Sequence, residues 1–174
     1  MCIRDRPIND LDIAHTMFLI GDGGNAELNK KLKLTDVLKN ELAQYDQNSS
    51  IIFLGDNIYP VGMPSKQQKA ERTLAEHKLN VQLEMLDNFQ GKIMFIPGNH
   101  DWAKYGLEGV LRQEKYIEKY LNEKRNNLTD KHDDDWEQFV FPGKGCGDPF
   151  DVKLNDDLVV ILIDSQWWLS LIHI

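Results

Sequence analysis

The chain has 174 residues, of which 41% are hydrophobic and 28% are charged, proportions typical of a globular domain and not of a disordered or collagen-like protein. Lysine and arginine number 20 against 28 aspartates and glutamates, and the net charge of −8 argues against a basic surface for binding nucleic acid. No run of about 18 apolar residues occurs, so the sequence predicts no transmembrane segment in this chain.

Four short apolar runs predict strands. Their apolar residues follow one another directly instead of alternating with polar ones, which predicts strands that are covered on both faces. A fifth strand is expected at 150–154, joined to the last run by a hairpin turn at 155–157. The four runs are 16–20, 51–54, 93–96 and 158–163.

Between these runs, apolar residues recur at helical spacing in three segments. We expect each apolar stripe to pack against a sheet as part of the core. The alternation of strand and helix predicts an α/β fold built as a layered sheet. The stripes are Leu34, Val37, Leu38 and Leu42, then Leu79, Leu83 and Leu86, then Leu107, Val110, Leu111, Ile117, Tyr120 and Leu121.

The two ends of the chain, residues 1–6 and 170–174, resemble translated sequencing-adapter DNA more than protein. We therefore expect a non-native leader and a non-native tail around one native domain at 10–169. The polar and acidic segment 126–137 predicts a solvated loop.

Polar residues follow the first three predicted strands directly. The first strand ends in Gly21-Asp22-Gly23-Gly24, the second in Gly55-Asp56-Asn57-Ile58-Tyr59, and the third in Gly98-Asn99-His100-Asp101. In α/β sheets, ligand sites gather beyond the carboxyl ends of the strands. If these strands are neighbours, Asp22, Asp56, Tyr59, Asn99 and His100 meet at one rim of the sheet.

Such a rim has the chemistry of a metal site. Two carboxylates, a phenol and an amide oxygen are hard donors that suit hard or borderline cations. Asp22 and Asp56 would repel each other unless a cation lay between them, and one carboxylate can bridge two ions about 3.5–4 Å apart. His100 is placed to protonate a leaving alkoxide or to stabilise developing negative charge, and Asp101 is placed to orient His100.

The three blocks resemble those of the calcineurin-like metallophosphoesterases, and the pair Gly24 and Tyr59 is similar to the purple acid phosphatase variant. The resemblance implies an αββα sandwich, layered sheets with flanking helices, of which 10–169 is the N-terminal and incomplete part. It further implies hydrolysis of a small phosphorylated substrate by a metal-bound hydroxide, in an extracytoplasmic or cell-envelope setting.

The same resemblance assigns ligands. Asp22 and Tyr59 would bind the first metal, Asp56 would bridge, Asn99 would bind the second metal, and His100 would be the acid. A phenolate ligand favours Fe(III), accompanied by Zn, Mn or Fe(II).

The sequence departs from the family pattern in its histidines. The common form has a histidine at position 24, where this chain has Gly24. Three more histidine ligands are expected downstream, but only His132 and His173 follow Asp101, and neither fits those blocks. We therefore expect this stretch to hold metal poorly, above all at the second position.

Two other functions remain open. Residues Gly21–Ala26 fit a dinucleotide-binding fingerprint, G-x-G-x-x-A, after a strand. A non-catalytic interaction domain with a degenerate metal site is the second alternative. Sensitivity to a chelator separates a metal-dependent hydrolase from both.

Overall fold

The structure is a computed structural model that describes residues 13–28, 30, 33–126 and 137–172. Its centre is a parallel sheet of β1 (Thr16–Ile20), β2 (Ser49–Phe53) and β3 (Lys92–Phe95), in that order across the sheet. A second, antiparallel sheet is the hairpin of β4 (Phe150–Lys153) and β5 (Val159–Leu162). The predicted strands and the predicted hairpin are confirmed.

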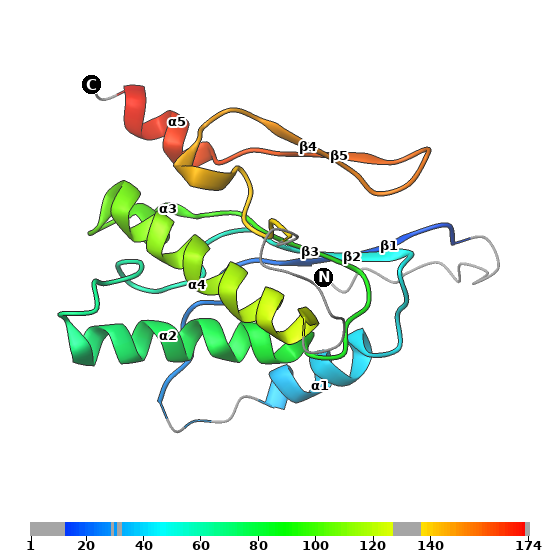
Figure 1. Ribbon diagram of the computed structural model, residues 1–174, viewed down its shortest axis with the longest axis horizontal. Helices are drawn as coiled ribbons and strands as arrows, with labels where there is room; N and C mark the ends of the chain where they lie inside the picture. Colours follow the sequence, from blue (N-terminus) through cyan, green and yellow to red (C-terminus); the bar gives the residue numbers. More distant parts are fainter. Residues whose placement is uncertain (1–12, 29, 31–32, 127–136, 173–174) are drawn as a thin grey trace, which may run out of the picture.

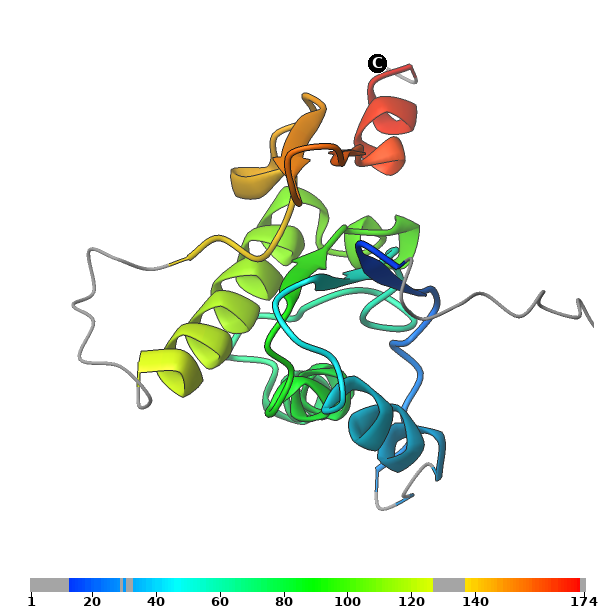
Figure 2. The same cartoon turned by 90° about the vertical axis from the view of Figure 1, so that its right-hand side faces the viewer.

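The helices flank these sheets. Figure 1 shows α1 (Lys33–Leu42), α2 (Lys69–Leu83) and α4 (Gly106–Asn126) on one face of the parallel sheet. The β4–β5 hairpin and α5 (Ser165–Ile172) lie on the opposite side, as the rotated view in Figure 2 also shows. The short α3 (Asn99–Trp102) follows β3 directly, and single 3₁₀ turns lie at Glu84–Leu86 and Gly143–Gly145. This layering confirms the predicted α/β fold and is consistent with the expected αββα arrangement.

Alternation along the strands divides the core into two layers. Ile51 and Phe53 of β2 belong to the cluster that packs against the helices, whereas Ile52 faces Val152 and Leu162 of the hairpin. The aromatic rings of Phe53 and Phe95 stack with centroids 4.2 Å apart on the helix side. Burying each such side chain contributes on the order of 1.5–3 kcal/mol, so both faces of β2 are held firmly.

The expectation that every strand is covered on both faces is wrong for β1 and β5. Leu19 of β1 is 59% exposed and Ile161 of β5 is 65% exposed, so the described residues leave part of one face of each strand uncovered. The first helical stripe is likewise only partly buried. Leu34 and Val37 are exposed, while Leu42 at the end of α1 is fully buried near the 3₁₀ turn Glu84–Leu86.

Three sequence expectations concern residues outside the described part of the chain. These are the leader at 1–6, most of the acidic segment 126–137, and the last two residues of the tail at 170–174. Residues 170–172 belong to α5. Within the described ranges, no helix is both long enough and apolar enough to cross a bilayer.

Candidate metal centre

The carboxyl ends of β1, β2 and β3 lie next to one another because the strands are parallel and adjacent. The ladder continues past the strands, since the Leu54 amide donates to the Ile20 carbonyl at 2.8 Å. Backbone hydrogen bonds then join the first strand-end loop, which contains Asp22, to the second strand-end loop, which contains Asp56 and Tyr59. The Gly24 amide donates to the Asp56 carbonyl at 3.0 Å, and the Tyr59 amide donates to the Gly24 carbonyl at 3.0 Å. Backbone bonds thus fix the two loops that carry the predicted carboxylates.

Both carboxylates stand on strained backbone. Asp22 has φ 57° and Asp56 has φ 55°, in the left-handed region that L-residues other than glycine seldom adopt. Such a conformation costs on the order of 1–3 kcal/mol and clusters at functional sites. The two strained aspartates follow neighbouring strands, Asp22 after β1 and Asp56 after β2.

The Tyr59 phenol joins the two aspartates. Its Oη lies 2.5 Å from Asp22 Oδ1 and 2.9 Å from Asp56 Oδ2. A phenol has one hydrogen and can donate it to only one of these oxygens. The hydrogen bonds to Asp22 and Asp56 raise the pKa of Tyr59, so the phenol holds its proton tightly while no cation is present. Three hard oxygen donors with a deficit of protons between them fit a hard cation.

Asn99 shares a hollow with these aspartates. The hollow has a volume of about 350 Å³ and is lined by Asp22, Asp56 and Asn99, together with Ser165 and Gln166 at the start of α5. Asn99 itself is exposed. The structure therefore brings all four predicted metal ligands to one rim, three of them around the hollow and Tyr59 through its hydrogen bonds.

His100 is held by one contact of its backbone and one contact of its ring. Its amide donates to Asp56 Oδ1 at 3.0 Å, and its Nδ1 lies 2.8 Å from the Pro60 carbonyl. Because a carbonyl oxygen only accepts, Nδ1 carries a hydrogen and Nε2 is left for proton transfer. The imidazole packs on the Tyr59 ring, with centroids 4.2 Å apart. The predicted acid thus adjoins the predicted ligands.

Asp101 requires a correction. It was expected to orient His100, but its side chain is fully buried and accepts hydrogen bonds from the amides of Gly98 at 2.8 Å and Ile58 at 2.9 Å. Asn57 contributes two further bonds, from its amide and from Nδ2, both 3.1 Å long. Burial raises the pKa of Asp101 to about 6, against the lowering effect of these bonds. Asp101 therefore joins the loop after β2 to the loop after β3. The residue that contacts the His100 ring in the way expected of Asp101 is Pro60, through its carbonyl.

Position 24 is closed to any side chain. A Cβ on Gly24 would lie 2.2 Å from the carbonyl carbon of Asn57 and 2.5 Å from the Asp56 carbonyl oxygen. The first loop therefore presses directly on the second, and a histidine ligand at this position would require the loops to separate. Glycine at 24 and tyrosine at 59 are two parts of one arrangement, because the same contact brings the Tyr59 amide to the Gly24 carbonyl.

Sequence reasoning missed three buried polar residues of α2. Arg72, Lys78 and Gln82 are 8%, 5% and 1% exposed. Each donates to a backbone carbonyl of the loop after β2, at Pro64, Tyr59 and Asn57 respectively. Lys78 and Gln82 directly precede the buried Leu79 and Leu83, and polar residues flanking an apolar stripe at a four-residue interval are the signal that could have found them.

A link between the two sheets was also missed. Trp102 Nε1 donates to Asp164 Oδ2 at 2.8 Å, and Asp164 Oδ1 accepts from the Trp167 amide at 3.0 Å. Asp164 is 1% exposed, and burial raises the pKa of its carboxyl. The third loop of the rim is therefore attached to the beginning of α5.

The described residues supply only part of a metal site. They contain no group of three or more histidine, cysteine, aspartate or glutamate side chains arranged to hold an ion. His15 contacts Ser50 Oγ and His77 contacts the Glu27 carbonyl, so neither faces the rim. His132 and His173 lie outside the described residues. The candidate metal ligands at the rim are two carboxylates, a phenol and a side-chain amide.

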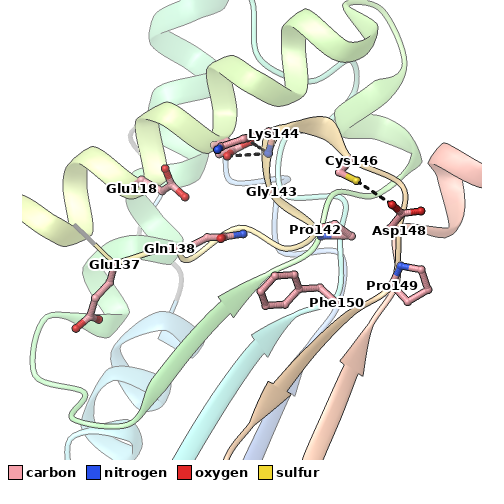
Figure 3. A pocket seen from close by; sticks show the side chains of 11 residues that line it. Glu118, Glu137, Gln138, Pro142, Gly143, Lys144, Cys146, Asp148, Pro149 and Phe150 are labelled. Atoms are coloured by element: carbon pink, nitrogen blue, oxygen red, sulfur yellow. Dashed lines mark hydrogen bonds between the residues drawn. The ribbon is translucent and has the colours of Figure 1, made fainter. Parts of the chain in front are cut away.

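A second acidic hollow of about 410 Å³ lies between α4 and the segment 137–150 (Figure 3). Here the single N–H of the Lys144 amide is shared between the two carboxylate oxygens of Glu114, at 2.9 and 2.8 Å. Burial, followed by the charge of Glu114, raises the pKa of Glu118 to about 7. Figure 3 shows the Cys146 thiol directed to Asp148, 3.7 Å away. None of the strand-end residues lines this hollow.

Comparison with known proteins gives one family. The family model described as calcineurin-like phosphoesterase matches residues 9–166, a range that includes all three strand-end loops and the hairpin. Searches of curated proteins and of solved structures find no match.

Proposed function

The chain belongs to the calcineurin-like phosphoesterase family, and on that basis we propose that its strand-end rim hydrolyses phosphate esters with two metal ions. Family membership itself supports metal-dependent phosphoester hydrolysis in general. The observation that carries the proposal to this rim is the Tyr59 phenol, which lies within hydrogen-bond distance of both Asp22 and Asp56. The two carboxylates share this one phenol, and a cation between them would offset their mutual repulsion.

Four side chains would hold the metals. Asp22 and Tyr59 would bind the first ion, Asp56 would lie between the two ions, and Asn99 would bind the second. The phenol favours Fe(III) at the first position, with Zn, Mn or Fe(II) beside it. Bound metals would supply Lewis-acid activation of water and of the phosphoryl oxygens.

The chain's own residues would position the substrate and move the proton. In its imidazolium form His100 would keep its Nδ1 hydrogen on the Pro60 carbonyl and donate its Nε2 proton to the leaving alkoxide, which would leave a neutral imidazole protonated at Nδ1. Asp56 accepts the His100 amide through Oδ1, so the same carboxylate that would contact metal also fixes the acid. A displacement of the second loop would therefore move the ligand and the acid together.

The finer assignment is a phosphatase of the purple acid type that acts on small phosphate monoesters. It is supported by the tight packing of Gly24 on the Asp56–Asn57 peptide, which leaves Tyr59 in place of a histidine. An extracytoplasmic or cell-envelope location is proposed from the sequence resemblance alone.

Dinucleotide binding is not favoured. Its fingerprint at Gly21–Ala26 requires a helix to begin at the glycines, whereas α1 begins at Lys33. The Gly24 amide, which would face a pyrophosphate, donates to the Asp56 carbonyl instead.

The test uses the complete natural protein, because the further histidine ligands are expected beyond these residues. Release of p-nitrophenol from p-nitrophenyl phosphate is measured after chelation and after restoring Fe(III) with Zn(II) or Mn(II). We expect activity to be lost with the chelator and recovered with the metals. Hydrolysis that ignores the chelator would contradict the proposal, and a metal-loaded protein without hydrolysis would favour the interaction domain.

A further inference from the structure

We propose that Lys78 and Gln82 on α2 are positioning residues that place the Tyr59 phenol between Asp22 and Asp56 and thereby set the affinity of the rim for Fe(III). The inference rests on the proposed function, because it takes Tyr59 as a metal ligand. It goes further by assigning the helix behind the site a part in metal binding.

Both side chains hold the loop that carries Tyr59. Lys78 Nζ donates to the Tyr59 carbonyl at 2.7 Å, and Gln82 Nε2 donates to the Asn57 carbonyl at 2.9 Å. Residues four apart lie on one face of a helix, so α2 presents the two donors one turn apart. The carbonyls they hold are two residues apart in the loop.

Gln82 also meets the first loop. A Cβ on Gly23 would lie 2.9 Å from Gln82 Oε1, so the glutamine amide occupies the space that a side chain at position 23 would need. One residue of α2 is therefore in contact with the loop that carries Asp22 and with the loop that carries Tyr59. This arrangement sets the separation of the two loops.

The burial of these groups costs stability. Lys78 is 5% exposed, burial lowers its pKa, and within the described residues its ammonium has no carboxylate partner. Gln82 is 1% exposed, and its Oε1 has no hydrogen-bond partner among the described residues. A buried charge or amide without full pairing is less favourable than an apolar side chain of similar volume. Packing alone would be served better by residues like the neighbouring Leu79 and Leu83.

These two contacts limit the movement of Tyr59. Its carbonyl is held by Lys78 and its amide by Gly24, so the residue is fixed on both sides of its Cα. The phenol then reaches the aspartates by side-chain rotation alone, and the His100 ring supports one side of it. Release of the carbonyl would let the peptide rotate and carry the phenol away from Asp56.

The decisive variant is Lys78→Met, which shortens the side chain by one atom and removes the donor. Fe(III) binding is measured on the complete natural protein by competition with a chelator, and the free energy of unfolding of the metal-free protein is measured in denaturant. We expect Fe(III) affinity to fall about 10- to 100-fold, the usual effect of losing a residue that orients a ligand. The free energy of unfolding of the metal-free protein should change little, because the variant removes a buried ammonium while the Tyr59 carbonyl loses one hydrogen bond. Lys69→Met, on an exposed position of the same helix, should change neither quantity.

Other results would overturn the inference. Wild-type Fe(III) affinity in Lys78→Met would do so, as would a loss of affinity that is matched by an equal loss in unfolding free energy. If Lys78→Met does not fold, Gln82→Met decides in the same way. If the wild type binds Fe(III) and hydrolyses phosphate esters, and Lys78→Met binds Fe(III) equally well, only the positioning role is overturned. A wild-type protein that binds no Fe(III) overturns the positioning role together with the iron assignment.

Discussion

At the strand ends, Asp22 and Asp56 approach one phenol with too few protons among them, whereas in the hollow beside α4 the protein neutralises its own acids. There, Glu114 is satisfied by the Lys144 amide, and burial favours the protonated form of Glu118. Both regions are lined by carboxylates, and the strand-end rim adds the Tyr59 phenol. The two regions therefore differ in how their acids are satisfied: Asp22 and Asp56 depend on one shared phenol proton, whereas Glu114 has a backbone donor and Glu118 favours its protonated form.

Among the variants that test this difference between the two regions, Asp56→Asn is expected to change phosphatase activity most. The amide keeps the shape of the side chain but removes the charge that would hold both metals, so phosphatase activity of the complete protein should fall at least about 1000-fold. Bound metal is counted by elemental analysis alongside turnover. Glu118→Gln, the matched change in the other hollow, should leave both unchanged. Equal losses in the two variants would erase the distinction between the hollows.

His100→Ala separates the acid from the ligands. Without its imidazole, proton transfer to the leaving group is lost and kcat should fall about 100-fold, while metal content stays at the wild-type level. The exposed Cys146, changed to serine, serves as the control in the second hollow. Loss of metal in His100→Ala would show that His100 is a ligand and not the acid.

Gly24→Ala tests the close packing of the loop after β1 on the loop after β2. A Cβ there meets backbone at 2.2 Å, and we expect the free energy of unfolding to fall by about 1–3 kcal/mol, the usual effect of overpacking. Gly21→Ala is the matched control, because a Cβ on Gly21 meets nothing within 4 Å. Denaturant unfolding of the two variants measures the difference, and equal stability would mean that the loops can separate freely.

Glu118→Gln has the smallest effect, and that effect depends on pH. Because folding raises the pKa of Glu118 from 4.5 to about 7, the folded state binds the proton more tightly than the unfolded state. The wild type therefore loses stability as pH rises from 4.5 to 7, and the glutamine variant escapes this loss. For a half-buried group we expect the variant to be more stable by about 1–2 kcal/mol at pH 8 and unchanged at pH 4. Parallel pH profiles of the two proteins would contradict the raised pKa.

The sequence predicted the strands well because each is a short apolar run that ends at a glycine, a proline or an aspartate. It also predicted that Asp22, Asp56, Tyr59 and Asn99 would meet, since parallel neighbours bring their carboxyl ends together. It could not show what Asp101 does. The adjacent His100 was the nearest candidate in sequence, but the partners Asn57 and Ile58 lie 44 and 43 positions away.

Burial on helices was predicted less well, for a related reason. The periodicity of α1 indicates which residues share a face, but not how far along that face the neighbouring structure extends, so Leu34 and Val37 remain exposed. The buried Lys78 was missed because a lysine beside a leucine stripe reads as part of the polar face. Lys78 donates to a backbone carbonyl, that of Tyr59. Because every residue has a backbone carbonyl, the side chains of the loop give no sequence signal for this contact.

The bond from the Trp102 indole to Asp164 has a mechanical consequence. It spans the gap between layers that share no backbone ladder, and it enters the α3 turn three residues after Asn99. The loop that carries Asn99 is therefore bonded directly to the segment between β5 and α5. Together with the apolar contacts of Ile52 with Val152 and Leu162, this bond holds the hairpin layer against the parallel sheet.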